Sequence, residues 1–176
     1  MTKQINSDII ASAFDSVFEF NDISKQFEGN PLESINLSLD LIWEEFATET
    51  IPAFEEGCNA IEVGNTKVAT IQAEKLLDGA VDTFVVLSGL LQKLQAAGMD
   101  VEQALLRITA NNLSKFPKKI DYNWCKQQGY APVFNDKYFC FVLKDENGKT
   151  RKPFDYKSVD LSDLVSEDFF KATKYV

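Results

Sequence analysis

The sequence predicts an all-α protein in which four to five helices form a bundle and a small β-hairpin lies near the C-terminus. Apolar residues recur at helical spacing over the first two-thirds of the chain. One long segment there is apolar or small on almost every side, as expected of a helix buried inside a bundle. Beyond residue 120 the pattern changes to a short apolar run followed by an Asn-Gly pair, which is typical of a hairpin. The 176 residues suffice for one domain with its own core.

The first two helices are predicted from their apolar stripes. Residues Ile9, Ala13, Val17 and Phe20 predict a first helix of about 15 to 20 residues. Gly29 and Pro31 mark a break after it. The second helix carries its stripe on Leu32, Ile35, Leu39, Ile42 and Phe46. We expect it to end at residues 55–57, where Gly57 follows two glutamates, and residues 58–65 to be a connector.

A third, longer helix is predicted over residues 66–96, with Gly98 as the residue that closes it. A fourth helix starts at Asp100, because Gln103 follows at the spacing of a capping box, and stops before Pro117. Further on, residues 137–143 predict a strand, residues 145–148 a turn, and residues 150–154 a weaker return strand. Residues 160–172 predict a short terminal helix. We therefore expect a helical bundle over residues 1–120 and an extension over residues 121–176, packed on the same domain.

Composition excludes several classes of function. The chain has 18 basic and 27 acidic residues, a net charge of −9, which argues against nucleic acid and against an anionic membrane surface as partners. It has no histidine, which excludes His-dependent catalytic triads and His-ligated zinc sites. Cys58, Cys125 and Cys140 form no Cys-x-x-Cys pair, and the N-terminus lacks the pattern of a signal peptide. Residues 76–91 are too short and too acidic to span a membrane. We expect a cytoplasmic protein with reduced thiols.

Two aspartates stand out within the apolar third helix. Asp78 and Asp82 lie one turn apart on one face, and no basic residue occurs between Lys75 and Lys93. A buried carboxylate must be protonated, paired, or bound to a cation. The alternative is a solvated stripe, or a structural pairing with a base on another helix.

The second helix offers a matching set of acids. Glu45 and Glu49 lie one turn apart, with Glu44 alongside. Two antiparallel helices that each present acids one turn apart can build an all-oxygen site without histidine. Such a site suits Mg²⁺ (or Mn²⁺) rather than zinc or copper.

These residues resemble a family. The segments are residues 18–21 (Phe-Glu-Phe-Asn), 41–45 (Leu-Ile-Trp-Glu-Glu), 77–82 (Leu-Asp-Gly-Ala-Val-Asp) and 112–116 (Asn-Leu-Ser-Lys-Phe). They are similar to motifs of the all-α nucleoside triphosphate pyrophosphohydrolases, the superfamily of MazG, the dimeric dUTPases and the phosphoribosyl-ATP pyrophosphohydrolases. The nearest likeness is to the short members found in bacteriophages, and it spans about residues 10 to 120. It implies a MazG-like bundle, and the host cytoplasm as the location of a phage-encoded protein.

The sequence departs from the family pattern, EExxE followed by ExxD, at two positions. Thr48 stands at the third glutamate of the first motif, and Glu49 comes one residue late. Gly79 stands at the glutamate of the second motif, with Asp78 beside it. A shift of one residue rotates a side chain by about 100° on an α-helix. Glu45 and Asp82 are therefore better supported as metal ligands than Glu49 and Asp78.

The resemblance implies hydrolysis of a nucleoside triphosphate to a monophosphate and pyrophosphate. The implied metal ligands for Mg²⁺ or Mn²⁺ are Glu45, Glu49, Asp78 and Asp82, and the implied catalytic carboxylates are Glu44, Glu45 and Glu49. Asn112 and Lys115 are the implied contacts to phosphate or sugar, the alternative for Lys115 being an ordinary solvated lysine. Candidates for a base pocket are Phe20, Asn21 and Trp43, although core packing is favoured for the two aromatics.

The implied assembly is a homodimer or homotetramer, which the apolar third helix also favours. Two other functions stay open. One is a protein that binds a nucleotide or a host protein on the same scaffold without catalysis. The other is an acidic mimic of DNA, whose charges would form an exposed array.

Overall fold

The computed structural model describes residues 4–165 and residue 169. The chain divides into two compact units, residues 1–101 with 166–176, and residues 102–165. It is mainly helical, with a small three-stranded sheet in the second unit, which confirms the coarse fold class. The residue predicted as a boundary, 120, lies inside the second unit. No helix among the described residues combines the length and the apolar character that crossing a membrane requires.

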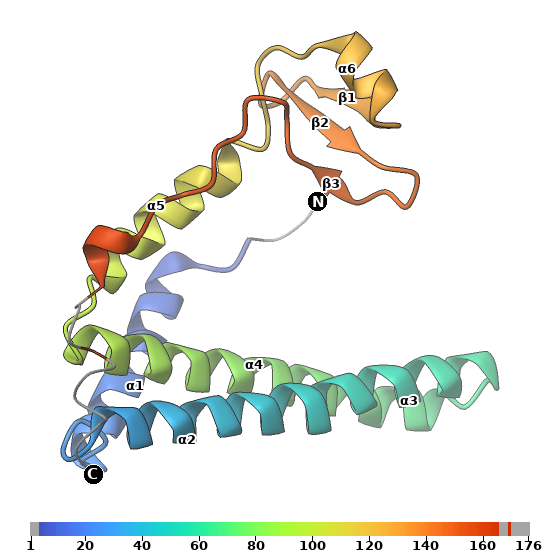
Figure 1. Ribbon diagram of the computed structural model, residues 1–176. Helices are drawn as coiled ribbons and strands as arrows, with labels where there is room; N and C mark the ends of the chain where they lie inside the picture. The colour runs from blue at the N-terminus through green and yellow to red at the C-terminus, as the bar shows by residue number, and fades with distance from the viewer. Residues whose placement is uncertain (1–3, 166–168, 170–176) are drawn as a thin grey trace. The chain divides into compact units, whose positions relative to one another are not determined.

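The first unit is built on two long antiparallel rods (Figure 1). One rod is continuous and consists of α2 (Pro31–Trp43), the π-helix η1 (Glu44–Thr50) and α3 (Ile51–Glu62). The other rod is α4 (Thr66–Ala96), and α1 (Ser7–Ile23) packs against α4. Asparagine side chains cap three of these helices by accepting a backbone N–H in the first turn, namely Asn6, Asn30 and Asn65.

The predicted third helix is confirmed, since α4 spans Thr66–Ala96 and Gly98 follows with a φ of 89°. The end predicted for the second helix is wrong, as is most of the connector over residues 58–65. The helix continues through Gly57 to Glu62, and the chain reverses at residues 63–65, where Gly64 has a φ of 71°. Gly57 is a contact position: a Cβ built there would stand 3.4 Å from Cβ of Gln72 on α4. A glycine in a helical segment can therefore mark a close contact between two helices rather than the end of a helix.

The core of the first unit contains buried polar side chains. Nδ2 of Asn21 donates to Oε1 of Gln92 at 3.2 Å, and Nε2 of Gln92 donates to the carbonyl of Phe14 at 2.9 Å. Lys93 is 7% exposed, and its ammonium donates to Oγ of Ser38 at 2.7 Å. These contacts tie α1 and α2 to one side of α4.

The other side of α4 is uncovered. Leu77 is 68% exposed and Val81 51% exposed, so the described part of a single chain does not bury this helix on every side. The reason is geometric: two helical neighbours, α1 and the α2–η1–α3 rod, can cover only part of a helix surface.

The second unit contains α5 (Val101–Leu113), which begins at the boundary, α6 (Tyr122–Gln127) and the antiparallel sheet. The strands β1 (Ala131–Asn135), β2 (Cys140–Lys144) and β3 (Thr150–Arg151) lie in the order β1-β2-β3. The predicted turn is confirmed: Oδ1 of Asp145 accepts from the N–H of Asn147 and Lys149, and Gly148 has a φ of 76°.

Three details of this unit differ from the prediction. The main strand begins at Cys140 rather than residue 137, and the return strand is two residues long and ends before Pro153. The elements α6 and β1 were not predicted. Of the terminal helix expected over residues 160–172, only the 3-10 turn η2 (Ser162–Leu164) is seen, and residues 166–168 and 170–172 lie outside the described residues.

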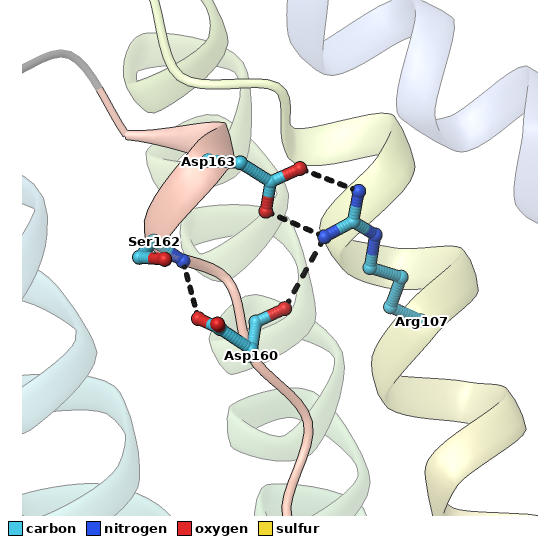
Figure 2. Close-up of polar contacts among 4 residues, drawn as sticks. All are labelled: Arg107, Asp160, Ser162 and Asp163. Carbon is cyan, nitrogen blue, oxygen red and sulfur yellow. Dashed lines mark hydrogen bonds and ion pairs between the residues drawn. The ribbon is translucent and has the colours of Figure 1, made fainter.

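The segment before η2 lies along α5. Nδ2 of Asn111 donates to the carbonyl of Lys157 at 2.7 Å, and Tyr156 shares a hydrogen bond with the same amide. Arg107 forms a two-pronged ion pair with Asp163 at 2.6 and 2.7 Å and also donates to the carbonyl of Asp160 (Figure 2). These bonds fix the C-terminal segment on the helix that carries Asn112.

Candidate functional site

The acids of the second predicted helix lie on the π-helix η1. Two hydrogen bonds in this segment span five residues, as a wide helical turn requires. The N–H of Ile51 donates to the carbonyl of Phe46, and Oγ1 of Thr50 donates to the carbonyl of Glu45 at 2.8 Å. A π-helix takes one residue more per turn than an α-helix and often occurs at functional sites. Glu49, five positions after Glu44, therefore lies one turn beyond it. The rotation of Glu49 expected from α-helical geometry does not apply here.

Gly79 lies at a close contact between α4 and η1. A Cβ built on Gly79 would stand 2.6 Å from Oγ1 of Thr50, 3.4 Å from the nitrogen of Thr50 and 3.5 Å from the carbonyl oxygen of Glu45. A glutamate does not fit at this position. A glycine at position 79 is thus a packing requirement of the π-helical turn, and Asp78 and Asp82 flank the contact.

The other four predicted acids act on Glu45. Burial raises the pKa of the Glu45 carboxyl, and the neighbouring charges of Glu49, Asp82, Glu44 and Asp78 raise it further, in that order. Glu45 and Asp82 are half-buried, whereas the other three are exposed. None of the five forms an ion pair with another described residue. The alternative of a structural pairing with a base therefore has no support in this part of the chain.

A cavity of about 410 Å³ adjoins this cluster. Its wall includes the predicted acids Glu49 and Asp78 together with Glu56, Gln72 and Lys75. Nε2 of Gln72 donates to Oε2 of Glu56 at 2.5 Å, so the Gln72 amide and the Glu56 carboxylate are hydrogen-bonded to each other. Among the described residues, the wall of the cavity thus combines acids of the candidate site with one basic side chain, Lys75.

A metal site needs ligand side chains that come together and donor atoms that suit the ion. Among the described residues, no three Cys, Asp or Glu side chains come together as a ready ligand set. The donor set is nevertheless all carboxylate, which suits Mg²⁺ or Mn²⁺, and a divalent cation would relieve the repulsion that raises the pKa of Glu45. The residues fit such an ion chemically.

Asn112 and Lys115 also lie together, in the second unit. Nζ of Lys115 donates to Oδ1 of Asn112 at 2.7 Å, at the C-terminal end of α5. Lys115 is half-buried, and this bond uses one N–H of its ammonium and the side-chain oxygen of Asn112.

The residues considered for a base pocket separate into two kinds. Asn21 is 4% exposed and bonded to Gln92, so it serves the packing of α1 on α4. Phe20 and Trp43 are 67% and 71% exposed, so the expectation that they pack in the core is wrong for the protomer.

Glu56, Gln72 and Lys75 are cavity residues that the sequence analysis missed. The interpretation of residues 55–57 as a helix stop placed Glu56 outside the site. The signal for Lys75 was its spacing, since residues three apart on a helix share a face and Asp78 follows it by three.

In comparisons with known proteins, no family model matches the chain, and no curated protein or solved structure shows significant similarity to it.

Proposed function

We propose that the protein is a metal-dependent nucleotide pyrophosphohydrolase, which cleaves a nucleoside triphosphate between its α- and β-phosphates to give a monophosphate and pyrophosphate. The observation that supports this proposal is that the charges of four other acids, Glu49, Asp82, Glu44 and Asp78, raise the pKa of Glu45, and that a cavity of about 410 Å³ lined by Glu49 and Asp78 adjoins them. The sequence resemblance to the MazG-like family points to the same chemistry.

In this proposal Glu45, Glu49, Asp78 and Asp82 hold Mg²⁺ or Mn²⁺. The bound cation would supply neutralisation of the phosphate charge and a lowered pKa for the attacking water. Glu44, which is exposed and adjacent, is then free of metal and accepts the proton of that water.

A second copy of the chain is the partner that we propose for the uncovered side of the first unit. The exposed apolar residues include Trp43, Phe46, Phe54, Leu77 and Val81, each more than half exposed. Exposed apolar side chains are typical of an interface where they form a contiguous patch. A homodimer or homotetramer would bury it.

The second candidate is a protein that binds a nucleotide without hydrolysing it. Gly79 favours this alternative, because the clash with Thr50 removes one glutamate from the ligand set implied by the family. Such a protein would retain the cavity and the cation site but bind the ion with fewer ligands.

A panel of nucleoside triphosphates, incubated with Mg²⁺, Mn²⁺ or EDTA, tests the choice through the release of pyrophosphate. Release that requires the metal supports hydrolysis. Binding of a nucleotide with no release by the folded protein favours the second candidate. Asp15→Asn is the matched control, because Asp15 is exposed on α1 and lies outside the acid cluster.

A further inference from the structure

Among the residues that the structure describes, Lys75 is the one basic residue in the wall of the 410 Å³ cavity. It lies on α4, three positions before Asp78, so the two share a helix face. The other residues of the wall that carry charge are Glu49, Glu56 and Asp78. The side chain of Lys75 is exposed, and these three carboxylates are the acids of the wall with which it could pair.

No such pair is present. Among the described residues, the ammonium of Lys75 has neither a salt bridge within 4.0 Å nor a hydrogen bond. Glu56 instead accepts from Gln72 at 2.5 Å. Lys93 on the same helix shows the contrast, because its ammonium is buried and donates to Ser38 at 2.7 Å. The three N–H groups of Lys75 are therefore available to a ligand in the cavity.

We propose that Lys75 binds the phosphate chain of the nucleotide and gives the cavity its preference for a pyrophosphate group over a single phosphate. This inference rests on the proposed function. An acidic cavity repels a polyphosphate unless cations are present, and an ammonium is a strong point donor to phosphate oxygens. The carboxylates hold the divalent cation at one part of the wall, and Lys75 adds the second positive charge at another.

The test uses pyrophosphate itself, which is a product and is not cleaved by the proposed reaction. Calorimetry in Mg²⁺ measures its affinity for the wild type, Lys75→Met, Lys75→Arg and the control Lys67→Met. Lys67 is exposed in the first turn of α4 and outside the cavity wall. Loss of one charged hydrogen bond weakens binding roughly tenfold or more. We expect that loss for Lys75→Met, near-wild-type affinity for Lys67→Met, and recovery in Lys75→Arg.

Other measurements separate the possible failures. Lys75→Met should bind Mg²⁺ at least as tightly as the wild type, because a neighbouring positive charge is gone, and should bind a nucleoside monophosphate with little change. Equal pyrophosphate affinity in Lys75→Met and the wild type overturns the role of Lys75 while leaving the hydrolase intact. Loss of Mg²⁺ binding together with pyrophosphate binding also overturns it, because the effect is then structural. A wild type that neither binds nor releases pyrophosphate refutes the proposed function itself.

Discussion

Gly79 on α4 and Thr50 on η1 are in such close contact that a Cβ on Gly79 would stand 2.6 Å from the Thr50 hydroxyl oxygen. The same hydroxyl donates to the carbonyl of Glu45 at 2.8 Å. One glycine and one threonine thus hold the π-helical turn against α4, with the acids of the candidate site on either side. The site and the packing of the two rods depend on the same contact.

Gly79→Ala should therefore lower the free energy of unfolding. The clash costs about 1–3 kcal/mol, and the better helix propensity of alanine returns about 1 kcal/mol at most. Thr50→Ala in the same chain removes the clashing oxygen, so the double variant should recover part of the loss in urea unfolding. Gly57→Ala is the control, because its Cβ would meet Gln72 at 3.4 Å and should be tolerated. Equal stability of Gly79→Ala and the wild type would show that the rods are not in this contact.

Glu45→Gln should raise stability at neutral pH in the presence of EDTA. The folded-state pKa of Glu45 is raised above its ordinary value of 4.5 by burial and by the other acids. Its contribution to stability is therefore complete below that ordinary value and is lost as the pH rises through the folded-state pKa. Urea unfolding from pH 4 to pH 7 should show a smaller decline for Glu45→Gln than for the wild type. Glu19→Gln, on the exposed side of α1, should follow the wild type, and a parallel decline in Glu45→Gln would contradict the cluster.

Lys93→Met should be as stable as the wild type or more stable at pH 7. Burial lowers the pKa of Lys93 below its ordinary value of 10.5, so the unfolded chain binds more protons than the folded one between the two pKa values. Wild-type stability accordingly gains a rising contribution from Lys93 as the pH increases toward 10.5. The methionine variant lacks this contribution, which urea unfolding at pH 7 to 10 measures. A large loss of stability at pH 7 would mean instead that the bonds of Lys93 to Ser38 and Gln26 outweigh its burial.

Much of the fold could be predicted because its signals are local. The bounds of α4, its closure at Gly98 and the turn at residues 145–148 follow from periodicity and turn chemistry. The signal for strand β1 is weaker, because Pro132 disfavours a strand interior, although an edge strand tolerates proline.

The acids of the candidate site could be predicted from the sequence, but their arrangement in space could not. No residue pattern distinguishes a π-helix from an α-helix here, so the alignment of Glu49 with Glu44 required the structure. The role of Gly79 depends on Thr50, which lies on another helix. Lys75 was missed because a lysine in a helix is usually a solvated residue, and only the cavity distinguishes this one.

Mg²⁺ and Mn²⁺ should raise the melting temperature relative to EDTA. A cation that binds only the folded state stabilises it by about 2.7 kcal/mol at 100 times its dissociation constant. Differential scanning calorimetry should therefore show a shift of several degrees in millimolar metal, which Asp15→Asn retains. Identical melting curves in EDTA and in both metals would exclude a folded-state metal site.

The central claim is that the acids are metal ligands that support hydrolysis, and Asp82→Asn tests it most directly. The change keeps the shape of the side chain and removes its charge. We expect pyrophosphate release in Mg²⁺ to fall by at least ~100-fold, because one ligand serves both water activation and phosphate binding. Unfolding in EDTA should show equal or greater stability, because one member of a repelling group is neutralised. A loss of about 3 to 5 kcal/mol in EDTA would contradict the claim, since it would reveal Asp82 as the partner of a buried base.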